Sequence, residues 1–214
     1  MPKLRNKSFT FRAISGIWIF VILTGIGIIS GAFSVFGAET AEIVDYRTFF
    51  GFDPRTTVWI IAELHLMFGA FVLGVPMFAV TVEYVGVLTK EERYDRLAKD
   101  FTRLLSASFA LTAALGGLLT FALFTLYPKV MNFMTGIFSE SFYIYAFFFF
   151  GETFVLYFYY YSWDSLKNRK GIHISAGVLL NIIGLIIMGI SNSWATYMMS
   201  PSGIDPETMK FTGT

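Results

Sequence analysis

Three ionisable side chains lie inside long apolar stretches of this sequence, where a charge is costly. Glu63 and His65 lie in one stretch, and Glu152 lies at the centre of another. A neutral imidazole in such a position can ligate haem iron, accept a proton or hydrogen-bond a neighbouring helix. A carboxylate there costs several kcal/mol unless it is protonated, paired or in contact with water. These three residues are the first candidates for chemistry.

Glu152 has two interpretations. As a functional residue, it is an acid that conducts protons or lies beside a haem propionate. As a structural residue, it is a protonated glutamic acid hydrogen-bonded across a helix bundle, and Thr153 beside it offers a hydroxyl group. Glu63 cannot share a helix face with His65, because the two are two residues apart. We therefore expect Glu63 near the membrane surface, paired with Arg55 or with another chain.

The apolar stretches themselves indicate transmembrane helices. Of 214 residues, 55% are hydrophobic and 14% are charged, whereas about 25% are charged in soluble domains. Each stretch exceeds the ~20 residues that a helix needs to cross a bilayer, and none alternates as a barrel strand would. We therefore predict an all-α integral membrane bundle. It is a single transmembrane domain over 1–214, with five helices at about 13–38, 56–82, 104–127, 141–163 and 172–199.

Lysine and arginine are distributed unevenly between the ends of these helices. Of the 16 basic residues, 12 lie in three segments between or before the apolar stretches: residues 1–12, 83–103 and 164–171. The positive-inside rule therefore predicts a cytoplasmic N-terminus and a C-terminus outside. In this orientation, His65 is about nine residues, or ~13 Å, from the outer end of its helix.

Composition excludes several classes of site. The chain has no cysteine, which excludes disulfides, iron–sulfur clusters, thiolate-bound zinc and covalently attached haem. The net charge of +1 gives no indication of nucleic acid as a partner. The lipid bilayer is the expected environment.

Other polar and aromatic residues are weaker candidates. Glu83 and His173 each lie at the cytoplasmic end of a stretch, where they can reach the membrane surface. The mixed-charge segment 91–103 is expected to be a solvated helix or loop. The segment 157–161 is rich in tyrosine and, together with Trp163, is expected to form an aromatic belt at the interface.

From Arg55 onward, the sequence resembles subunit I of the cytochrome bd quinol oxidases. The resemblance covers about residues 55–203, and the region 39–214 corresponds to the N-terminal half of that subunit; the helix at 13–38 is additional. The spacings from arginine to histidine, from histidine to glutamate and from glutamate to Trp-Asp are like those of the family. The shared residues are Arg55, His65, Glu83, Val85-Gly86-Val87-Leu88, Phe109-Ala110-Leu111, Gly116, Glu152-Thr153-Phe154-Val155, Trp163-Asp164, His173, Asn192, Trp194 and Pro201-Ser202-Gly203.

This resemblance implies a cofactor, partners and a location. His65 would be the axial ligand of a haem iron, in a protein with one haem b. Arg55, Glu152 and Thr153 would lie in the haem environment or on a proton path. The protein would reside in the cytoplasmic (inner) membrane of a prokaryote. Its partners would be other membrane subunits of a respiratory complex and either a periplasmic cytochrome c or a second haem-bearing chain.

The sequence also departs from the family pattern. A second acid expected near Ile144 or Tyr145 is missing. The quinol-binding loop and the ligands of the low-spin haem would lie beyond residue 214. We therefore expect a haem b-binding electron-transfer subunit that is not an oxidase by itself. Two alternatives stay open: a haem-free scaffold that keeps the oxidase fold, and a subunit that completes an oxygen or quinol site with another chain, with Glu152 delivering protons.

Overall fold

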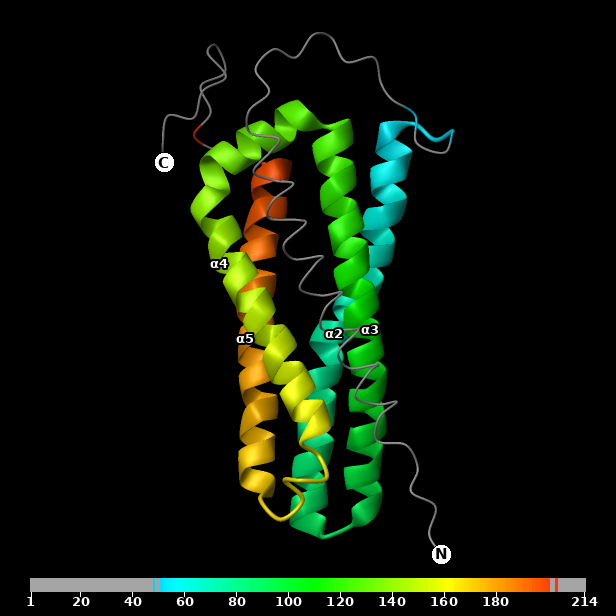
Figure 1. Ribbon diagram of the computed structural model, residues 1–214, viewed down its shortest axis with the longest axis vertical. Coiled ribbons are helices and arrows are strands. Elements are labelled where there is room, and N and C mark those ends of the chain that lie inside the picture. The colour runs from blue at the N-terminus through cyan, green and yellow to red at the C-terminus, as the bar shows by residue number, and fades with distance from the viewer. Residues whose placement is uncertain (1–47, 49–50, 201–202, 204–214) are drawn as a thin grey trace, which may run out of the picture. The chain divides into compact units, whose positions relative to one another are not determined.

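The computed structural model describes residue 48, residues 51–200 and residue 203. This part of the chain contains no strand and forms four helices (Figure 1): α2 (Pro54–Thr89), α3 (Glu92–Leu126), α4 (Pro128–Tyr161) and α5 (Lys170–Met199). The predicted all-α class is therefore confirmed for the described residues. The first predicted helix, at 13–38, lies outside them.

Each of the four helices is long and apolar enough to cross a membrane. The shortest, α5, has 30 residues, and at ~1.5 Å per residue it is longer than the ~30 Å hydrocarbon core of a bilayer. Large apolar side chains, such as Trp59, Phe121 and Phe147, are exposed on the helix surfaces. Water-soluble proteins rarely expose extensive apolar surface. By length and composition, these four helices are those of a multi-pass membrane protein.

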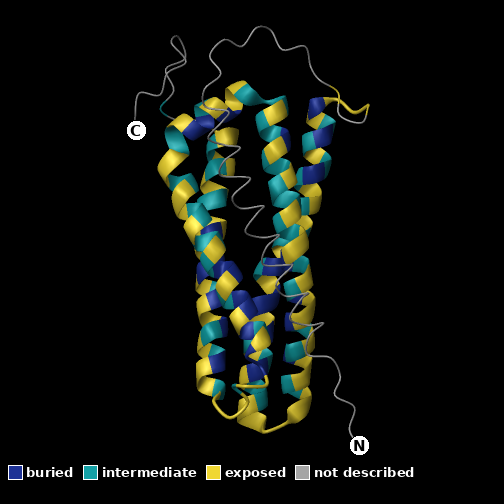
Figure 2. Cartoon of the chain, in the orientation of Figure 1, coloured by how far each residue is buried: buried dark blue, intermediate teal, exposed yellow. Residues whose placement is uncertain are grey.

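The helices pack in two pairs. α2 packs along α3 and α4 packs along α5, and the pairs meet where α2 contacts α5 and α3 contacts α4. Residues 90–91 and 162–169 connect the helices within each pair at the same end of the bundle, which we call the double-loop end. The opposite end, where α3 passes into α4, is the Tyr127 end. The most completely buried side chains gather toward the double-loop end (Figure 2).

The observed helices are longer than the predicted apolar stretches. α2 continues to Thr89, beyond the predicted end near 82, and α3 begins at Glu92, before the predicted start near 104. Hydropathy marks only the part of a helix that faces lipid, whereas the backbone hydrogen bonds of the helix continue past it. Ala98 and Thr102 are fully buried. The expectation that the segment 91–103 is only a solvated face is therefore wrong.

α4 begins at Pro128, well before the predicted start near 141. Proline fits the first turn of a helix because the N–H that it lacks has no partner there. The backbone leaves helical geometry at Phe138, with φ −107° and ψ 15°, and Figure 1 shows the resulting bend near the start of α4. The predicted stretch at 141–163 is the segment after this kink, and the helix ends at Tyr161.

Candidate functional site

His65 lies on α2 with its ring against α3. Its Nδ1 atom is 3.1 Å from the backbone carbonyl oxygen of Thr112. A carbonyl oxygen can only accept a hydrogen bond, so Nδ1 carries the hydrogen and Nε2 keeps its lone pair. Histidines that ligate metals are commonly oriented by such a bond from the second ring nitrogen to a backbone carbonyl. The half-buried ring therefore has the tautomer that an axial ligand needs.

Gly116 of α3 leaves room for the ring. A Cβ atom at this position would lie 2.8 Å from Cε1 of His65, which is closer than such atoms approach in proteins. These residues fit a haem held through one imidazole, because the ring is oriented by the backbone and Nε2 remains available. The described residues contain no group of three or more His, Cys, Asp or Glu side chains that could hold a bare metal ion.

Arg55 and Glu63, the charged residues predicted near His65, are both exposed. Arg55 lies ten residues before His65, which is about 15 Å along a helix. Among the ion pairs of the described residues, none joins Arg55 to Glu63. The structure therefore does not bring the guanidinium group of Arg55 to the histidine ring.

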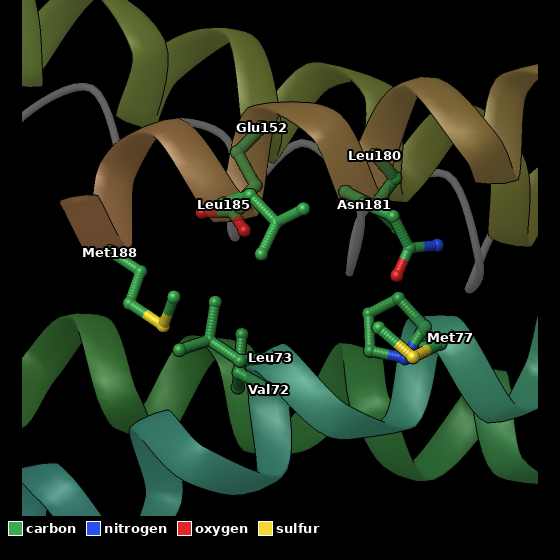
Figure 3. Close-up of a pocket in the computed structure, with 10 residues that line it drawn as sticks. Val72, Leu73, Met77, Glu152, Leu180, Asn181, Leu185 and Met188 are labelled. Atoms are coloured by element: carbon green, nitrogen blue, oxygen red, sulfur yellow. The ribbon is translucent and has the colours of Figure 1, made fainter.

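Glu152 lies on α4 and is buried where α4 meets α2 and α5. Its carboxyl group lines a cavity of about 30 Å³ (Figure 3). Asn181 of α5 also lines this cavity, and its Nδ2 atom donates to the carbonyl oxygen of Gly177 at 2.8 Å. The rest of the lining is apolar apart from backbone atoms. A water needs ~10–15 Å³, so this cavity has room for water but not for a porphyrin.

Thr153 is buried beside Glu152, but its hydroxyl group turns back to its own helix. Thr153 Oγ1 donates to the carbonyl oxygen of Phe149 at 2.8 Å, so it does not donate to Glu152. The cavity reaches Val72 on α2, which is seven residues, or about 10 Å along the helix, from His65. Glu152 and His65 therefore lie at different levels of the bundle.

A group of polar residues that the sequence did not predict joins all four helices at the double-loop end. Glu83 of α2 and His173 of α5 are both 0% exposed, and His173 Nδ1 is 2.7 Å from Glu83 Oε1. Lys170 Nζ donates to the same oxygen at 2.9 Å, and the Tyr159 hydroxyl donates to Glu83 Oε2 at 2.7 Å. The expectation that Glu83 and His173 reach the membrane surface is wrong, because the neighbouring helices enclose both side chains.

Asp95 and Trp163 complete this group. The carboxylate of Asp95 pairs with Lys170 and accepts a hydrogen bond from Trp163 Nε1 at 3.3 Å. Tyr159 and Trp163 are nearly inaccessible, so these two rings belong to the interior and not to an interfacial belt. We call the six residues together the charge cluster: Glu83, Asp95, Tyr159, Trp163, Lys170 and His173.

The sequence pattern hides the charge cluster because its members are far apart along the chain. Glu83 and His173 are separated by 90 positions. A single charged residue at the end of an apolar stretch usually extends its charged group into water, which favoured the simpler interpretation. The available signal was that Glu83, Lys170 and His173 have complementary chemistry and lie at helix ends expected on the same membrane face.

The fold defines a class: a multi-pass helical membrane protein, in which the ring of one histidine, His65, is oriented by a backbone carbonyl group. A sequence model of the family described as cytochrome bd terminal oxidase subunit I matches residues 54–212. The chain belongs to this family, which confirms the predicted resemblance. A comparison with curated proteins gave no match, and a comparison with solved structures gave none either. Family membership points to a haem-binding respiratory membrane subunit.

Proposed function

We propose that this chain is a haem b-binding subunit of a multi-subunit respiratory electron-transfer complex, with one haem b held on Nε2 of His65. The observation that carries the proposal is the hydrogen bond from His65 Nδ1 to the Thr112 carbonyl oxygen, which leaves Nε2 as a ligand. Bound haem supplies a one-electron redox centre. The chain's own contribution is to orient the imidazole through Thr112 and to leave it space at Gly116.

The proposed arrangement in the membrane has five spans, with the helix at 13–38 as the first. The basic residues favour a cytoplasmic N-terminus and a C-terminus outside, in the cytoplasmic (inner) membrane of a prokaryote. In this topology His65 is in the outer half of the membrane. Electrons would pass between its haem and a periplasmic cytochrome c or a second haem-bearing membrane chain.

Glu152 is proposed to serve the haem environment or a proton path, together with Thr153 and Arg55. The burial of Glu152 beside a cavity with room for water supports this role for Glu152. The same role has weaker support for Thr153 and Arg55, because the Thr153 hydroxyl donates to its own helix and Arg55 is exposed. If Glu152→Gln leaves the oxygen consumption of the assembled complex unchanged, Glu152 does not conduct protons.

A haem-free scaffold is the second candidate, and a specific packing feature favours it. Tyr145, which occupies the region where the family pattern places a second acid, stacks on Phe149 with ring centroids 6.4 Å apart. Phe149 in turn stacks on Phe109 at 5.6 Å. Aromatic side chains therefore fill space between α4 and α3, as they would in a bundle that kept the fold and lost a polar function.

Spectroscopy of the native complex, purified through this subunit, separates the two candidates. We expect a reduced-minus-oxidised difference spectrum of haem b, and we expect His65→Ala to remove the contribution of one haem. Addition of imidazole to His65→Gly should restore that contribution, because a free imidazole can replace the missing ligand.

Glu63→Ala is the matched control, since Glu63 is exposed on the same helix two residues away. We expect it to keep the full spectrum. A His65→Ala complex that assembles and shows the same haem content as the wild-type complex would contradict the haem proposal and leave the scaffold.

A further inference from the structure

The charge cluster brings two acidic and two basic side chains together: Glu83 and His173 are fully buried, and Asp95 and Lys170 are partly exposed. Glu83 comes from α2, Asp95 from α3, and Lys170 and His173 from α5. Tyr159 of α4 supplies both a hydroxyl group and a backbone carbonyl to it. Burying a charge is expensive unless it is paired and hydrogen-bonded. The contacts of Glu83 and His173 therefore constrain which of the two side chains is protonated.

The two ring nitrogens of His173 both face acceptors. Nε2 is 2.8 Å from the backbone carbonyl oxygen of Tyr159, which can only accept. Nδ1 is 2.7 Å from Glu83 Oε1, and an ionised carboxylate is also acceptor-only. A neutral imidazole has one N–H and can satisfy only one of these contacts. The observed pair of contacts therefore requires one proton more than a neutral histidine and an ionised glutamate contain.

The environment of Glu83 decides where that proton resides. Glu83 Oε1 already accepts a hydrogen bond from Lys170 Nζ at 2.9 Å, and Oε2 accepts one from the Tyr159 hydroxyl at 2.7 Å. These two donors, one of them the cationic ammonium group of Lys170, favour the ionised form of the Glu83 carboxyl group before His173 is considered. We infer that Glu83 and His173 form a buried proton-binding site, occupied by one proton carried on the His173 ring as an imidazolium.

Charge balance and aromatic packing support this assignment independently. With an imidazolium at His173, the two cations balance the carboxylates of Glu83 and Asp95, and the cluster is neutral. The Tyr159 ring stacks on the His173 ring at 4.3 Å, and the Trp163 ring meets it edge-on at 4.5 Å. Lys170 Nζ lies 4.9 Å from the centroid of the Trp163 ring. The face of an aromatic ring stabilises a cation, and the stacked Tyr159 ring presents its face to the His173 ring.

The inference is tested by NMR of the ring nitrogens in the full-length protein labelled with ¹⁵N-histidine. The chain has only two histidines, so four ring nitrogens account for the whole spectrum. At neutral pH we expect both His173 nitrogens to carry a directly bonded hydrogen. A His173 ring with one unprotonated, strongly downfield nitrogen would overturn the inference. The outcome does not depend on haem, so it stands or fails separately from the proposed function.

The variant Glu83→Gln tests the pairing itself. The amide of glutamine can donate to Nδ1 of His173, so this ring no longer needs its second proton. We expect the His173 ring of the variant to carry one N–H group in place of two. Asp164→Asn is the matched control, because Asp164 pairs with Lys99 on the exposed surface nearby; it should leave His173 doubly protonated. Two N–H groups on His173 in folded Glu83→Gln would contradict the assignment.

Discussion

The two histidines of this chain lie in opposite chemical situations. At the Tyr127 end, the half-buried His65 uses one nitrogen to donate to a backbone carbonyl, and the other keeps its lone pair. At the double-loop end, the fully buried His173 has hydrogen-bond partners at both nitrogens and lies among the five other side chains of the charge cluster. The role of a histidine in a membrane helix therefore depends on the partners of its two ring nitrogens. The position of the histidine within an apolar stretch does not by itself distinguish a metal ligand from a member of an ion cluster.

The largest expected effect comes from breaking the charge cluster. Glu83→Ala removes the carboxylate that Lys170, His173 and Tyr159 all contact. Removing one partner of a buried ion pair costs about 3–5 kcal/mol, because the remaining charge stays buried. We expect a loss of this size in the free energy of unfolding, measured by denaturation in mixed micelles. Glu63→Ala, which removes an exposed carboxylate, should change the stability by less than about 0.5 kcal/mol. Equal stabilities of the two variants would contradict the contrast between the two ends.

A smaller effect is expected at the His65 end from Gly116→Ala. The new Cβ atom would lie 2.8 Å from His65 Cε1, so the ring must move away from the Thr112 carbonyl. Overpacking of this kind costs about 1–3 kcal/mol, and we expect haem binding to weaken roughly tenfold or more, since ~1.4 kcal/mol is tenfold in affinity. Haem content per polypeptide measures it. The control is Gly69→Ala, because a Cβ atom at Gly69 meets nothing within 4 Å. If both variants keep full haem content, Gly116 does not position the ligand.

The smallest effect sharpens the comparison between buried and exposed charges at one end of the molecule. Lys99 Nζ is 2.7 Å from Asp164 Oδ1 on the exposed surface of the double-loop end. Exposed ion pairs contribute less than about 1 kcal/mol, so Asp164→Asn should lower the unfolding free energy by no more than this. A loss as large as that of Glu83→Ala would mean that the outer pair belongs to the same cooperative unit as the charge cluster.

The sequence predicted the class of fold well, because hydropathy depends on local composition. Each of the four predicted apolar stretches of the described region coincides with one helix, and the errors are at the helix ends. α3 extends through charged residues from Glu92, and α4 begins at Pro128 and kinks at Phe138. Hydropathy cannot place such ends, because the backbone hydrogen bonds of a helix do not stop where the lipid does.

Prediction of the sites was less complete, for a different reason. His65, Glu152 and Thr153 could be selected as candidates because polar side chains stand out in apolar stretches. The Thr112 carbonyl that orients His65 carries no sequence signal, since every residue has a backbone carbonyl. The charge cluster has only a weak sequence signal, because Glu83, Asp95 and His173 come together only when three helices pack.

A density map of the native complex tests the central claim most directly, because it shows what lies against Nε2 of His65. We predict a flat macrocycle beside α2, with its iron ~2 Å from this nitrogen, the usual metal–imidazole distance. Side chains packed against Nε2, with no porphyrin there, would contradict the claim and identify the subunit as a scaffold.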